Sequence, residues 1–392
     1  MTGKPSDFAD VELSSAEVSR YSRHLVVPQI GRDGQRKLKA GSVLIVGTGG
    51  LGSPVSLYLA AAGVGRIGLV DYDTVEVTNL QRQIVHSEST IGMLKVDSAA
   101  MRLRGLNPHI TFETYREPLT SENAFDVLTP YDVIVDGTDN FPTRYLLNDA
   151  AVMLAKPLVY GSVYRFEGQV SVFGMKEGPC YRCLLPEPPA PGLVPGCAEA
   201  GVLGVVPGTI GTLQATEAIK LIVGIGEPLV GRLLLYDALD MTFDTITLPK
   251  RPNCPVCGES PTITQLIDYE GFCGVHAYDH PMPEQATIPA LSAQDIKARL
   301  DANEPLLLLD VREPYELTIS QIRGAVNIPM SQLPMRQPEI PRDRPVVVFC
   351  HAGVRSARLI GRLQAAGYRN LINMKGGINA WSKEVDPSIP RY

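Results

Sequence analysis

The chain has 392 residues, of which 44% are hydrophobic and 20% charged, and its formal net charge at pH 7 is −6. This length predicts two or three domains, the composition is ordinary for a globular protein, and the negative charge argues against nucleic acid as the main partner. No apolar run reaches the ~18 residues that a membrane span requires. The first residues lack the basic and apolar regions of a signal peptide, so we expect neither export nor membrane insertion.

The first half of the chain alternates strands with helices. Ser14–Glu17 has the sequence of a capping box, which predicts a helix start. Residues 43–46 form a short apolar run of the kind found in buried parallel strands, and the helix that follows is expected to end at Gly63. Further strands are expected at 67–70 and 131–136. This order predicts a doubly wound, Rossmann-like α/β domain.

A glycine-rich turn follows the strand at 43–46. Gly47, Gly49 and Gly52 match the dinucleotide-binding fingerprint, and Asp71 lies where an acid that binds ribose belongs. Glycine lets the backbone approach phosphates, and the start of the next helix offers N–H donors and a partial positive charge. Taken alone, this motif fits an NAD-dependent dehydrogenase as well as an ATP-binding enzyme.

Charged residues further along favour ATP. Arg82 and Lys95 place two cations after the ribose acid, and Asp139–Asn140 follows the strand at 131–136, where parallel sheets bind ligands. Two cations and a carboxylate suit an ATP triphosphate with Mg²⁺, because negative charge builds on the departing pyrophosphate. Hydride transfer requires none of these groups.

Residues 47–83, GTGGLGSPVSLYLAAAGVGRIGLVDYDTVEVTNLQRQ, resemble the adenylation domain shared by MoeB, ThiF and the ubiquitin-activating enzymes. The resemblance extends over about Glu12–Cys257. It implies that ATP and Mg²⁺ contact a set of loop residues: Gly47, Gly49, Gly50, Gly52, Asp71, Thr78, Asn79, Leu80, Gln81, Arg82, Lys95, Asp139 and Asn140. Arg82, Lys95 and Asp139 are also expected to act in catalysis, although Arg82 alone would be read as a solvated helix charge.

The resemblance also implies a substrate and an assembly. Arg23, in RYSRH, matches the arginine that the family's homodimer extends to the partner's ATP, so we expect a homodimer in which Arg23 is catalytic. The family's substrate is a small β-grasp protein that ends in Gly-Gly. Its terminal carboxylate attacks the α-phosphate of ATP, giving an acyl-adenylate and pyrophosphate, and positioning by cations replaces a covalent nucleophile.

Four of the seven cysteines form two Cys-x-x-Cys pairs, Cys180 with Cys183 and Cys254 with Cys257. Seven cysteines are too few for a disulfide scaffold, and without an export signal such pairs indicate metal binding in a reducing compartment. The predicted location is therefore the cytoplasm. Four thiolates suit a tetrahedral, structural Zn²⁺ in a zinc knuckle, and the family's zinc ligands match both pairs. A redox disulfide is the alternative.

Residues 184–208 are rich in proline and glycine and are expected to form a functional or mobile loop before a helix at 209–222. Cys197 lies in this loop, at the position of the family's crossover-loop cysteine. That cysteine forms a thioester in ubiquitin activation and an acyl disulfide in some sulfur-transfer relatives. Cys197 is therefore expected to cleave an acyl disulfide formed on Cys350, a cysteine in the second half of the chain. The alternatives are a third metal ligand and an unreactive packed thiol. Cys273 is expected to be incidental.

The stretch 259–287 is expected to be an interdomain linker. The adenylation domain is therefore predicted over 1–258 and a second α/β domain over 288–392, whose first strand is expected at 306–309. Such a tether would hold the second domain near the adenylate at high effective concentration.

A strand at 346–349 leads into Cys350, and a helix is expected over 356–366. In the tight loop between them, successive N–H groups and the helix N-terminus converge on one anion, an arrangement that stabilises a thiolate or a persulfide. Gly353 is expected to permit the curl of the loop and Ser356 to cap the helix. A cysteine in an anion cradle also fits a protein phosphatase, whose loop is longer, or a buried structural thiol.

The surroundings of Cys350 resemble a rhodanese domain over about Ile288–Val385. Three segments carry the resemblance: Asp310–Glu313, Gly324–Pro329 and Gly376–Trp381. The family resemblance makes Cys350 the catalytic sulfur carrier. Ser320–Gln321 stands where that family commonly has Gly-His, which we expect to alter local packing rather than activity.

The order of the two domains resembles that of the MoeZ-type adenylyltransferase/sulfurtransferases. It implies that a Cys350 persulfide attacks the acyl-adenylate and displaces AMP, which leaves an acyl disulfide on Cys350. Cys197 or an external thiol then cleaves this acyl disulfide and releases the carrier protein as a thiocarboxylate. The implied partners are a MoaD-, ThiS- or CysO-like sulfur-carrier protein and a sulfur donor, either thiosulfate or a desulfurase persulfide. Two other hypotheses are an adenylating enzyme whose rhodanese domain only docks partners, and a dehydrogenase fused to a sulfurtransferase.

Overall fold

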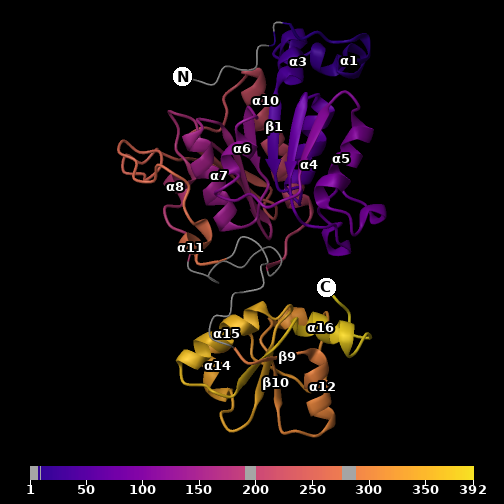
Figure 1. Ribbon diagram of the computed structural model, residues 1–392, viewed down its shortest axis with the longest axis vertical. Coiled ribbons are helices and arrows are strands. Elements are labelled where there is room, and N and C mark those ends of the chain that lie inside the picture. The colour runs from indigo at the N-terminus through magenta and orange to yellow at the C-terminus, as the bar shows by residue number, and fades with distance from the viewer. Residues whose placement is uncertain (1–7, 9, 190–199, 276–287) are drawn as a thin grey trace. The chain divides into compact units, whose positions relative to one another are not determined.

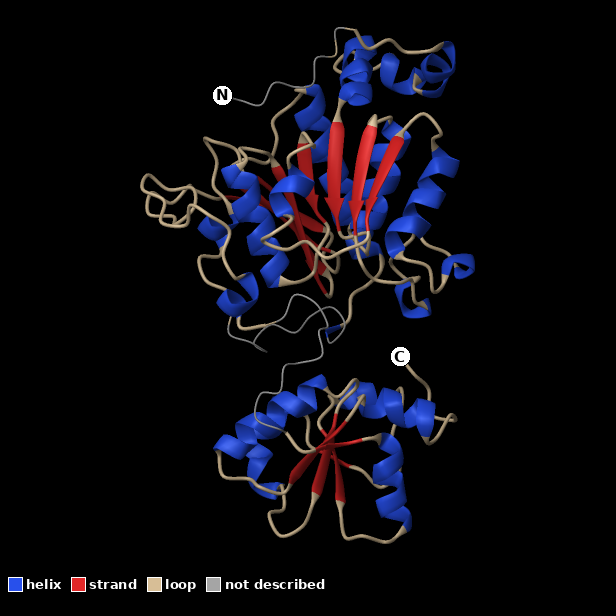
Figure 2. Cartoon of the chain, in the orientation of Figure 1, coloured by secondary structure: helices blue, strands red, loops and turns tan. Residues whose placement is uncertain are grey.

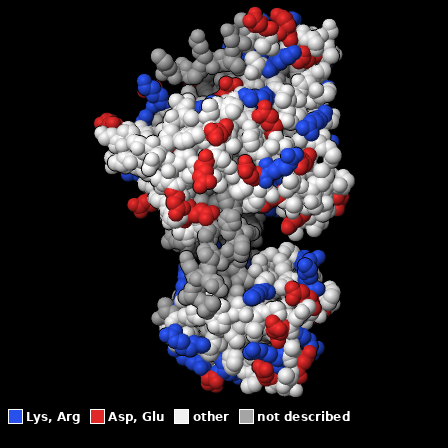
Figure 3. All heavy atoms as spheres, viewed as in Figure 1, with Lys and Arg blue, Asp and Glu red and all other residues white. Residues whose placement is uncertain are grey.

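The structure is a computed structural model that describes residues 8, 10–189, 200–275 and 288–392. The chain divides into two compact units, Met1–His280 and Pro281–Tyr392, and each contains its own sheet, as Figures 1 and 2 show. Among the described residues, no helix is both long and apolar enough to cross a membrane. On the face drawn in Figure 3, acidic and basic side chains are mixed over the first unit.

The first unit contains an eight-stranded sheet in the order β3-β2-β1-β4-β5-β6-β7-β8. Its strands are β1 (Ser42–Val46), β2 (Arg66–Val70), β3 (Thr111–Tyr115), β4 (Val133–Asp136), β5 (Leu158–Tyr164), β6 (Glu167–Phe173), β7 (Arg232–Asp237) and β8 (Thr242–Thr247). The strands from β3 to β5 run parallel, whereas β5 to β8 are antiparallel. The parallel half confirms the predicted Rossmann-like fold, and the antiparallel half extends it.

Helices cover both faces of this sheet. The helices are α1 (Ser15–Arg20), α2 (Ser22–Leu25), α3 (Gly31–Ala40), α4 (Gly52–Ala62), α5 (Lys95–Leu106), α6 (Ala124–Leu128), α7 (Phe141–Met153), α8 (Tyr181–Leu184), α10 (Val205–Val223) and α11 (Tyr269–Cys273), with 3₁₀ turns η1 (Val77–Asn79) and η2 (Glu88–Thr90). Val43 and Ile45 pack against α4, α5 and α10, while Leu44 and Val46 pack in the core with α6 and α7. Because both faces are buried, β1 is a continuous apolar run.

The predicted helix signals at Ser14 and Gly63 are confirmed. The Ser14 hydroxyl accepts the Glu17 N–H at 3.3 Å, the Glu17 carboxylate accepts the Ser14 N–H at 2.8 Å, and Gly63 ends α4 with φ of 87°. The helix predicted from residue 209 begins earlier, at Val205. Pro207 does not prevent this, because the first turn of a helix needs no N–H from that residue.

The last helix of the first unit, α11, covers a buried ion pair. Arg182 donates to both carboxylate oxygens of Asp149, with Nε–Oδ1 and Nη2–Oδ2 distances of 2.9 and 2.8 Å. Both residues are almost inaccessible to solvent. The Tyr269 hydroxyl adds a hydrogen bond to Asp149 at 2.9 Å, and the rings of Tyr145 and Phe272 lie 4.8 and 4.6 Å from the Arg182 guanidinium.

These contacts correct the predicted linker, which begins too early at residue 259. Residues through Val275 pack against the core of the first unit because Tyr269 and Phe272 complete the cage around Arg182. Cys273 is buried in the same core, and burial raises the pKa of its thiol to about 11. A thiol with so little thiolate at neutral pH fits the incidental role expected for Cys273.

The second unit has a five-stranded parallel sheet in the order β11-β10-β12-β13-β9. Its strands are β9 (Ala290–Leu291), β10 (Leu307–Asp310), β11 (Val326–Asn327), β12 (Val346–Phe349) and β13 (Leu371–Met374), and its helices are α12 (Ala293–Asp301), α13 (Pro314–Leu317), α14 (Leu333–Arg336), α15 (Val354–Ala365) and α16 (Gly377–Glu384), with 3₁₀ turns η3 (Met330–Gln332) and η4 (Gln337–Glu339). Alternating side chains of β12 again enter two cores, one with α14 and α15 and one with α12 and α16.

We expect Asp149→Ala to lower the free energy of unfolding by about 3–5 kcal/mol, because it leaves the Arg182 charge buried and unpaired. Tyr269→Phe should cost about 1 kcal/mol, the value of one hydrogen bond. Urea unfolding followed by circular dichroism measures both, and Tyr58→Phe, at an exposed tyrosine, is the control. If Asp149→Ala cost no more than this control, the ion pair would not stabilise the packing of α11.

Candidate functional sites

The glycine turn after β1 touches the turn after β4. Gly47 has φ of 91°, and a Cβ atom there would lie 2.7 Å from the carbonyl oxygen of Gly137. A Cβ on Gly52 would lie 1.9 Å from the Gly47 carbonyl oxygen, so both positions require glycine. β1 lies between β2 and β4 in the sheet, and the order reverses between β1 and β4. Open parallel sheets bind ligands at this point.

Asp71, predicted to bind ribose, also holds the glycine turn. Its Oδ2 accepts hydrogen bonds from the Thr48 N–H at 2.8 Å and from the Thr48 hydroxyl at 3.0 Å. Burial raises the pKa of the Asp71 carboxyl despite the nearby charge of Lys95 and these hydrogen bonds. The turn is therefore anchored to the end of β2 as well as to β4.

Lys95 begins α5 and is buried, and its Nζ lies 2.7 Å from Oδ2 of Asp73. The sequence did not identify Asp73. It lies two residues after the predicted ribose acid, and its backbone N–H donates to Asp71 Oδ1 at 3.0 Å. The ion pair holds the Lys95 ammonium beside the end of β2, where a phosphate could displace or share the Asp73 contact.

The segment 78–82 lies beside the glycine turn. The Arg82 side chain donates to the Thr78 carbonyl at 3.2 Å, and its Cδ lies 3.7 Å from the position of a Cβ on Gly50. Asn79 accepts the Glu76 N–H at 3.1 Å within η1. Leu80 and Gln81 follow η1, and Gln81 contacts Gly204 at the start of α10, because a Cβ on Gly204 would lie 2.2 Å from the Gln81 carbonyl oxygen.

Asp139 and Asn140 follow β4 at the same edge. Asp139 is exposed, whereas the Asn140 side chain caps α7 by accepting the Thr143 N–H at 2.9 Å. Arg144 is buried beneath them and donates to the Thr138 carbonyl at 3.0 Å. The glycine turn, Asp71, Arg82, Lys95 and Asp139 therefore lie around the carboxyl ends of β1, β2 and β4.

Two further polar residues support the glycine turn and had no motif to mark them. His86 lies 3.1 Å from the Thr48 carbonyl oxygen through Nε2 and 2.9 Å from the Ser98 hydroxyl through Nδ1. Burial lowers the pKa of His86 to about 4, so the ring is neutral and Nε2–H donates to Thr48. Gln83 is buried with its Nε2 3.5 Å from the position of a Cβ on Gly49.

Arg23 is not brought to this edge. It is exposed on α2, which packs against α3, and α3 leads directly into the start of β1. Figure 2 shows these N-terminal helices beyond the opposite end of the sheet from the glycine turn. Cys197, the predicted resolving thiol, lies outside the described residues.

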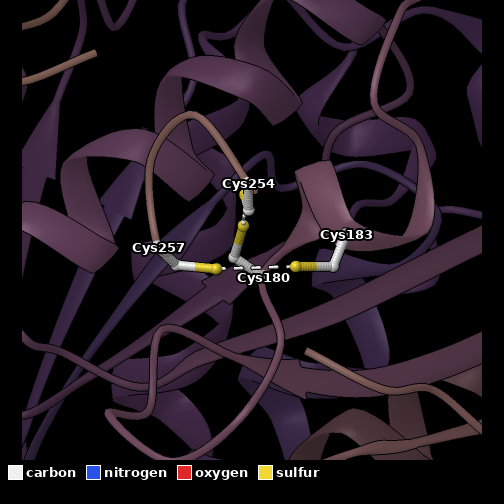
Figure 4. A group of neighbouring side chains, drawn as sticks. All are labelled: Cys180, Cys183, Cys254 and Cys257. Atoms are coloured by element: carbon white, nitrogen blue, oxygen red, sulfur yellow. Dashed lines mark hydrogen bonds between the residues drawn. The ribbon is translucent and has the colours of Figure 1, made fainter. Parts of the chain in front are cut away.

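The four paired cysteines converge on one point, as Figure 4 shows. Their sulfur atoms all lie within 4.8 Å of one another, with 3.5 Å between Cys180 and Cys254 and between Cys183 and Cys257. Tetrahedral Zn–S bonds of ~2.3 Å would place sulfur atoms ~3.8 Å apart. The donor set and spacing therefore fit a structural metal site that joins α8 to the segment before α11.

Cys350 lies in the loop between β12 and α15 and is buried. Its sulfur accepts the Gly353 N–H at 3.1 Å, and Gly353 has φ of 86°, as the predicted curl requires. The N–H of Ile378, at the start of α16, binds the Cys350 carbonyl at 2.9 Å. A Cβ on Gly377 would lie 2.3 Å from that carbonyl oxygen. The loop is thus fixed by backbone contacts from both sides.

Ser356 does not cap α15, contrary to expectation. The N-cap is Gly353, and Ser356 lies within the first turn with its hydroxyl 3.5 Å from the Cys350 sulfur and 2.7 Å from Asn373 Oδ1. Asn373, on β13, also donates to the Gly353 carbonyl at 3.1 Å. The Ser356 hydroxyl has one proton to donate and makes its shortest contact with Asn373 Oδ1, so it links the Cys350 loop to β13 and lies beside the sulfur.

Residues 21–256 match the ThiF family and residues 292–384 match the rhodanese-like domain. The chain belongs to the ThiF family. Its ThiF-family part resembles a crystal structure of E. coli MccB with ATP, at 25% identity and a TM-score of 0.53, covering 61% of this chain and 74% of that one.

Two curated relatives share both parts of this ThiF-family chain. It is 47% identical over 386 residues to a probable adenylyltransferase/sulfurtransferase MoeZ of Mycobacterium tuberculosis, covering 97% of this chain and 96% of that protein. It is also 47% identical over 403 residues to the adenylyltransferase and sulfurtransferase MOCS3 of Drosophila yakuba, covering 99% of this chain and 88% of that protein.

We expect Gly52→Ala to weaken ATP binding at least about 100-fold, which corresponds to ~2.7 kcal/mol. The added Cβ would displace the Gly47 carbonyl and with it the turn. Isothermal titration with a non-hydrolysable ATP analogue measures the affinity. Gly105→Ala is the matched control, because a Cβ on this exposed glycine of α5 meets nothing within 4 Å. Equal affinities for the two variants would contradict the assignment of this turn to the nucleotide.

Proposed function

We propose that the chain adenylates the C-terminal Gly-Gly carboxylate of a small β-grasp sulfur-carrier protein and then transfers sulfur from Cys350 to that carboxylate, giving a thiocarboxylate. One observation carries the proposal. A turn that suits a nucleotide, with two cations and an exposed acid at its edge, occurs in the same chain as a cysteine whose sulfur accepts a backbone N–H. The names of the two curated relatives combine the same two activities.

The residues around the glycine turn are suited to the adenylation step. Arg82 and Lys95 would balance the charge of the α- to γ-phosphates and of the departing pyrophosphate, and Asp71 would bind the ribose. Asp139 is exposed at the end of β4 and would bind Mg²⁺, which would neutralise phosphate oxygens. The carrier carboxylate forms a bond to the α-phosphorus while the bond to pyrophosphate breaks, so no covalent enzyme intermediate is needed.

The position of Arg23 supports a homodimer. In its own chain it lies beyond the start of β1, whereas the glycine turn follows the end of β1. A five-residue strand such as β1 is ~16 Å long, so an arginine side chain on that side serves a nucleotide better in a second copy. We therefore assign Arg23 to the partner's adenylation site.

The sulfur step uses the loop after β12. The terminal sulfur of a Cys350 persulfide attacks the acyl-adenylate carbonyl, a C–S bond forms, and AMP leaves with the electrons of the C–O bond. A thiol, either Cys197 or an external one, then attacks the Cys350 sulfur of the acyl disulfide. A new disulfide forms, and the thiocarboxylate leaves with the electron pair. The persulfide comes from thiosulfate or from a desulfurase.

Zn²⁺ is the metal that best suits the cysteine cluster, because tetrahedral thiolate sites select zinc and all four positions are filled by protein sulfur. A closed site of this kind has a structural role. A reducing compartment such as the cytoplasm would keep the four thiols available as ligands.

We expect Cys254→Ser to lower the bound zinc from one per chain to near zero and to lower the melting temperature by at least about 5 °C, because a structural site contributes folding free energy. Elemental analysis of the purified chain and differential scanning calorimetry measure the two effects. Cys273→Ser, outside the cluster, should retain the metal. Full metal content in Cys254→Ser would contradict the four-cysteine site.

Cys350→Ala should abolish thiocarboxylate formation and leave adenylation unchanged, because the two reactions use different residues. ATP–pyrophosphate exchange measures adenylation of a MoaD-, ThiS- or CysO-like carrier, and mass spectrometry of the carrier detects sulfur in place of oxygen. Cys273→Ala is the control and should retain both reactions.

The same experiment addresses the alternative in which the rhodanese unit only docks partners. In that case Cys350→Ala would form thiocarboxylate at the full rate without added sulfide. Such a result would contradict the sulfur-carrier role of Cys350.

A further inference from the structure

Tyr392 packs against the loop that carries Cys350. Its ring centroid lies 4.4 Å from that of His351, the residue after Cys350, with the two planes 31° apart. The backbone carbonyl of Tyr392 accepts a hydrogen bond from His351 Nε2. The Asn379 side chain also lies 2.9 Å from that nitrogen. Tyr392 therefore fixes the side chain next to the sulfur-carrying residue.

The Tyr392 hydroxyl also joins two ion pairs. It accepts a hydrogen bond from Arg312 Nη1 at 2.9 Å and donates to Glu316 Oε1 at 3.0 Å. Arg312 is fully buried and pairs with Asp310 at 2.6 Å. Glu316 accepts two hydrogen bonds from Arg355, at 2.7 and 2.8 Å. Burial raises the pKa of Tyr392 to about 12, so its hydroxyl keeps the proton that it donates.

Ser320 directs Arg312 toward Tyr392. Its hydroxyl accepts from Arg312 Nη1 at 3.2 Å, and its carbonyl accepts from Nη2 at 2.9 Å. Ser320–Gln321 stands where rhodanese domains commonly have Gly-His. The Ser320 hydroxyl therefore provides a hydrogen-bond acceptor that a glycine at this position would lack. The expected change in local packing is thus a polar contact on the same arginine that binds Tyr392.

Glu316 depends on all of its donors. It is 3% exposed, and besides Arg355 and Tyr392 it accepts the Glu313 N–H at 2.9 Å. A buried carboxylate that loses a donor becomes a less compensated negative charge. Arg355, its ionic partner, lies in the first turn of α15, five residues after Cys350. The balance between Glu316 and Arg355 therefore sets the charge beside the loop that carries the sulfur.

We propose that Tyr392 is a positioning residue of the sulfur-transfer site. Tyr392 holds His351 and compensates the charge of Glu316. Arg355 can then attract an anionic sulfur donor to Cys350. This inference rests on the proposed role of Cys350 as the sulfur carrier. Tyr392 need not touch the donor. It acts through Glu316, and removal of its hydroxyl alone would leave the ring on His351. Arg312 would keep Ser320 and Asp310 as acceptors, whereas Glu316 would lose a donor, so the surroundings of Cys350 would become more negative.

The test compares an anionic and a neutral alkylating reagent on Cys350 in the full chain. Mass spectrometry of the Cys350 peptide gives the rates with iodoacetate and with iodoacetamide, and their ratio reports the electrostatic potential at the sulfur. Tyr392→Phe should lower this ratio about 3-fold, which corresponds to ~0.65 kcal/mol and lies at the lower end of the net contribution of one hydrogen bond. Glu316→Gln should raise it, because Arg355 then lacks the negative charge of Glu316. Tyr392→Phe should have no effect in the Glu316→Gln background, and Tyr58→Phe, at an exposed tyrosine of the first unit, should leave the ratio unchanged.

Thiosulfate provides a second readout that a merely structural role would not move. In Tyr392→Phe the KM for thiosulfate should rise by about the same factor of 3. The kcat, normalised to the amount of Cys350 that can be alkylated, should stay unchanged. Two results would overturn the inference. One is a wild-type ratio of the iodoacetate and iodoacetamide rates in Tyr392→Phe. The other is a double variant of Tyr392→Phe and Glu316→Gln whose ratio equals the product of the two single effects. If the wild-type chain formed no persulfide from thiosulfate or from a desulfurase while the alkylation ratios followed the predicted pattern, the proposed function would fail and the positioning role would stand.

Discussion

Backbone contact between glycine turns at the ends of parallel strands is the constraint on which both sites depend. Neighbouring strands lie only ~4.8 Å apart, so the turns that follow them must approach without side chains. In the first unit Gly52 contacts the Gly47 carbonyl, and Gly47 contacts Gly137. In the second unit Gly377 contacts the Cys350 carbonyl. This approach leaves N–H groups at the surface of the turn, where they can face a phosphate or a sulfur atom.

Buried polar side chains then hold these turns in place. His86 and Asp71 bind Thr48 in the glycine turn, and Asn373 binds the Gly353 carbonyl in the cysteine loop. Each such group costs free energy when it is buried without a partner. The same networks therefore stabilise the fold and fix the geometry of the reacting groups, which explains why the two functions of the chain occupy rigid strand ends.

Sequence patterns predicted the parts of this structure that local chemistry determines. The apolar runs at β1 and β12, the glycine turn and the two cysteine pairs each carry a signal within a few residues. The antiparallel strands gave none of comparable strength: all six residues of β8 are exposed, so no buried face produces a period. The sequence places α11 in a linker, because the contacts that fix it, with Asp149 and Arg182, involve residues more than 80 positions away.

The same limit applies at the level of single residues. Gly353 rather than Ser356 starts α15, and only the structure shows that the Ser356 hydroxyl binds Asn373 and lies 3.5 Å from the Cys350 sulfur. Tyr392 reaches Glu316 across 76 positions of the sequence. No spacing rule links such residues, whereas Asp139 lies just after β4, and the family resemblance assigned Arg82 and Lys95 to the same nucleotide.

The central claim is that the sulfur held on Cys350 is the sulfur that reaches the adenylated carboxylate. A single-turnover experiment tests it most directly. The chain is loaded with isotope-labelled sulfur on Cys350, freed of excess donor, and mixed with ATP, Mg²⁺, a β-grasp carrier protein and unlabelled sulfide. The account predicts that the thiocarboxylate of the carrier contains the labelled sulfur and that the label disappears from Cys350 at the same rate. A thiocarboxylate that contains only unlabelled sulfur, with the label retained on Cys350, would contradict it.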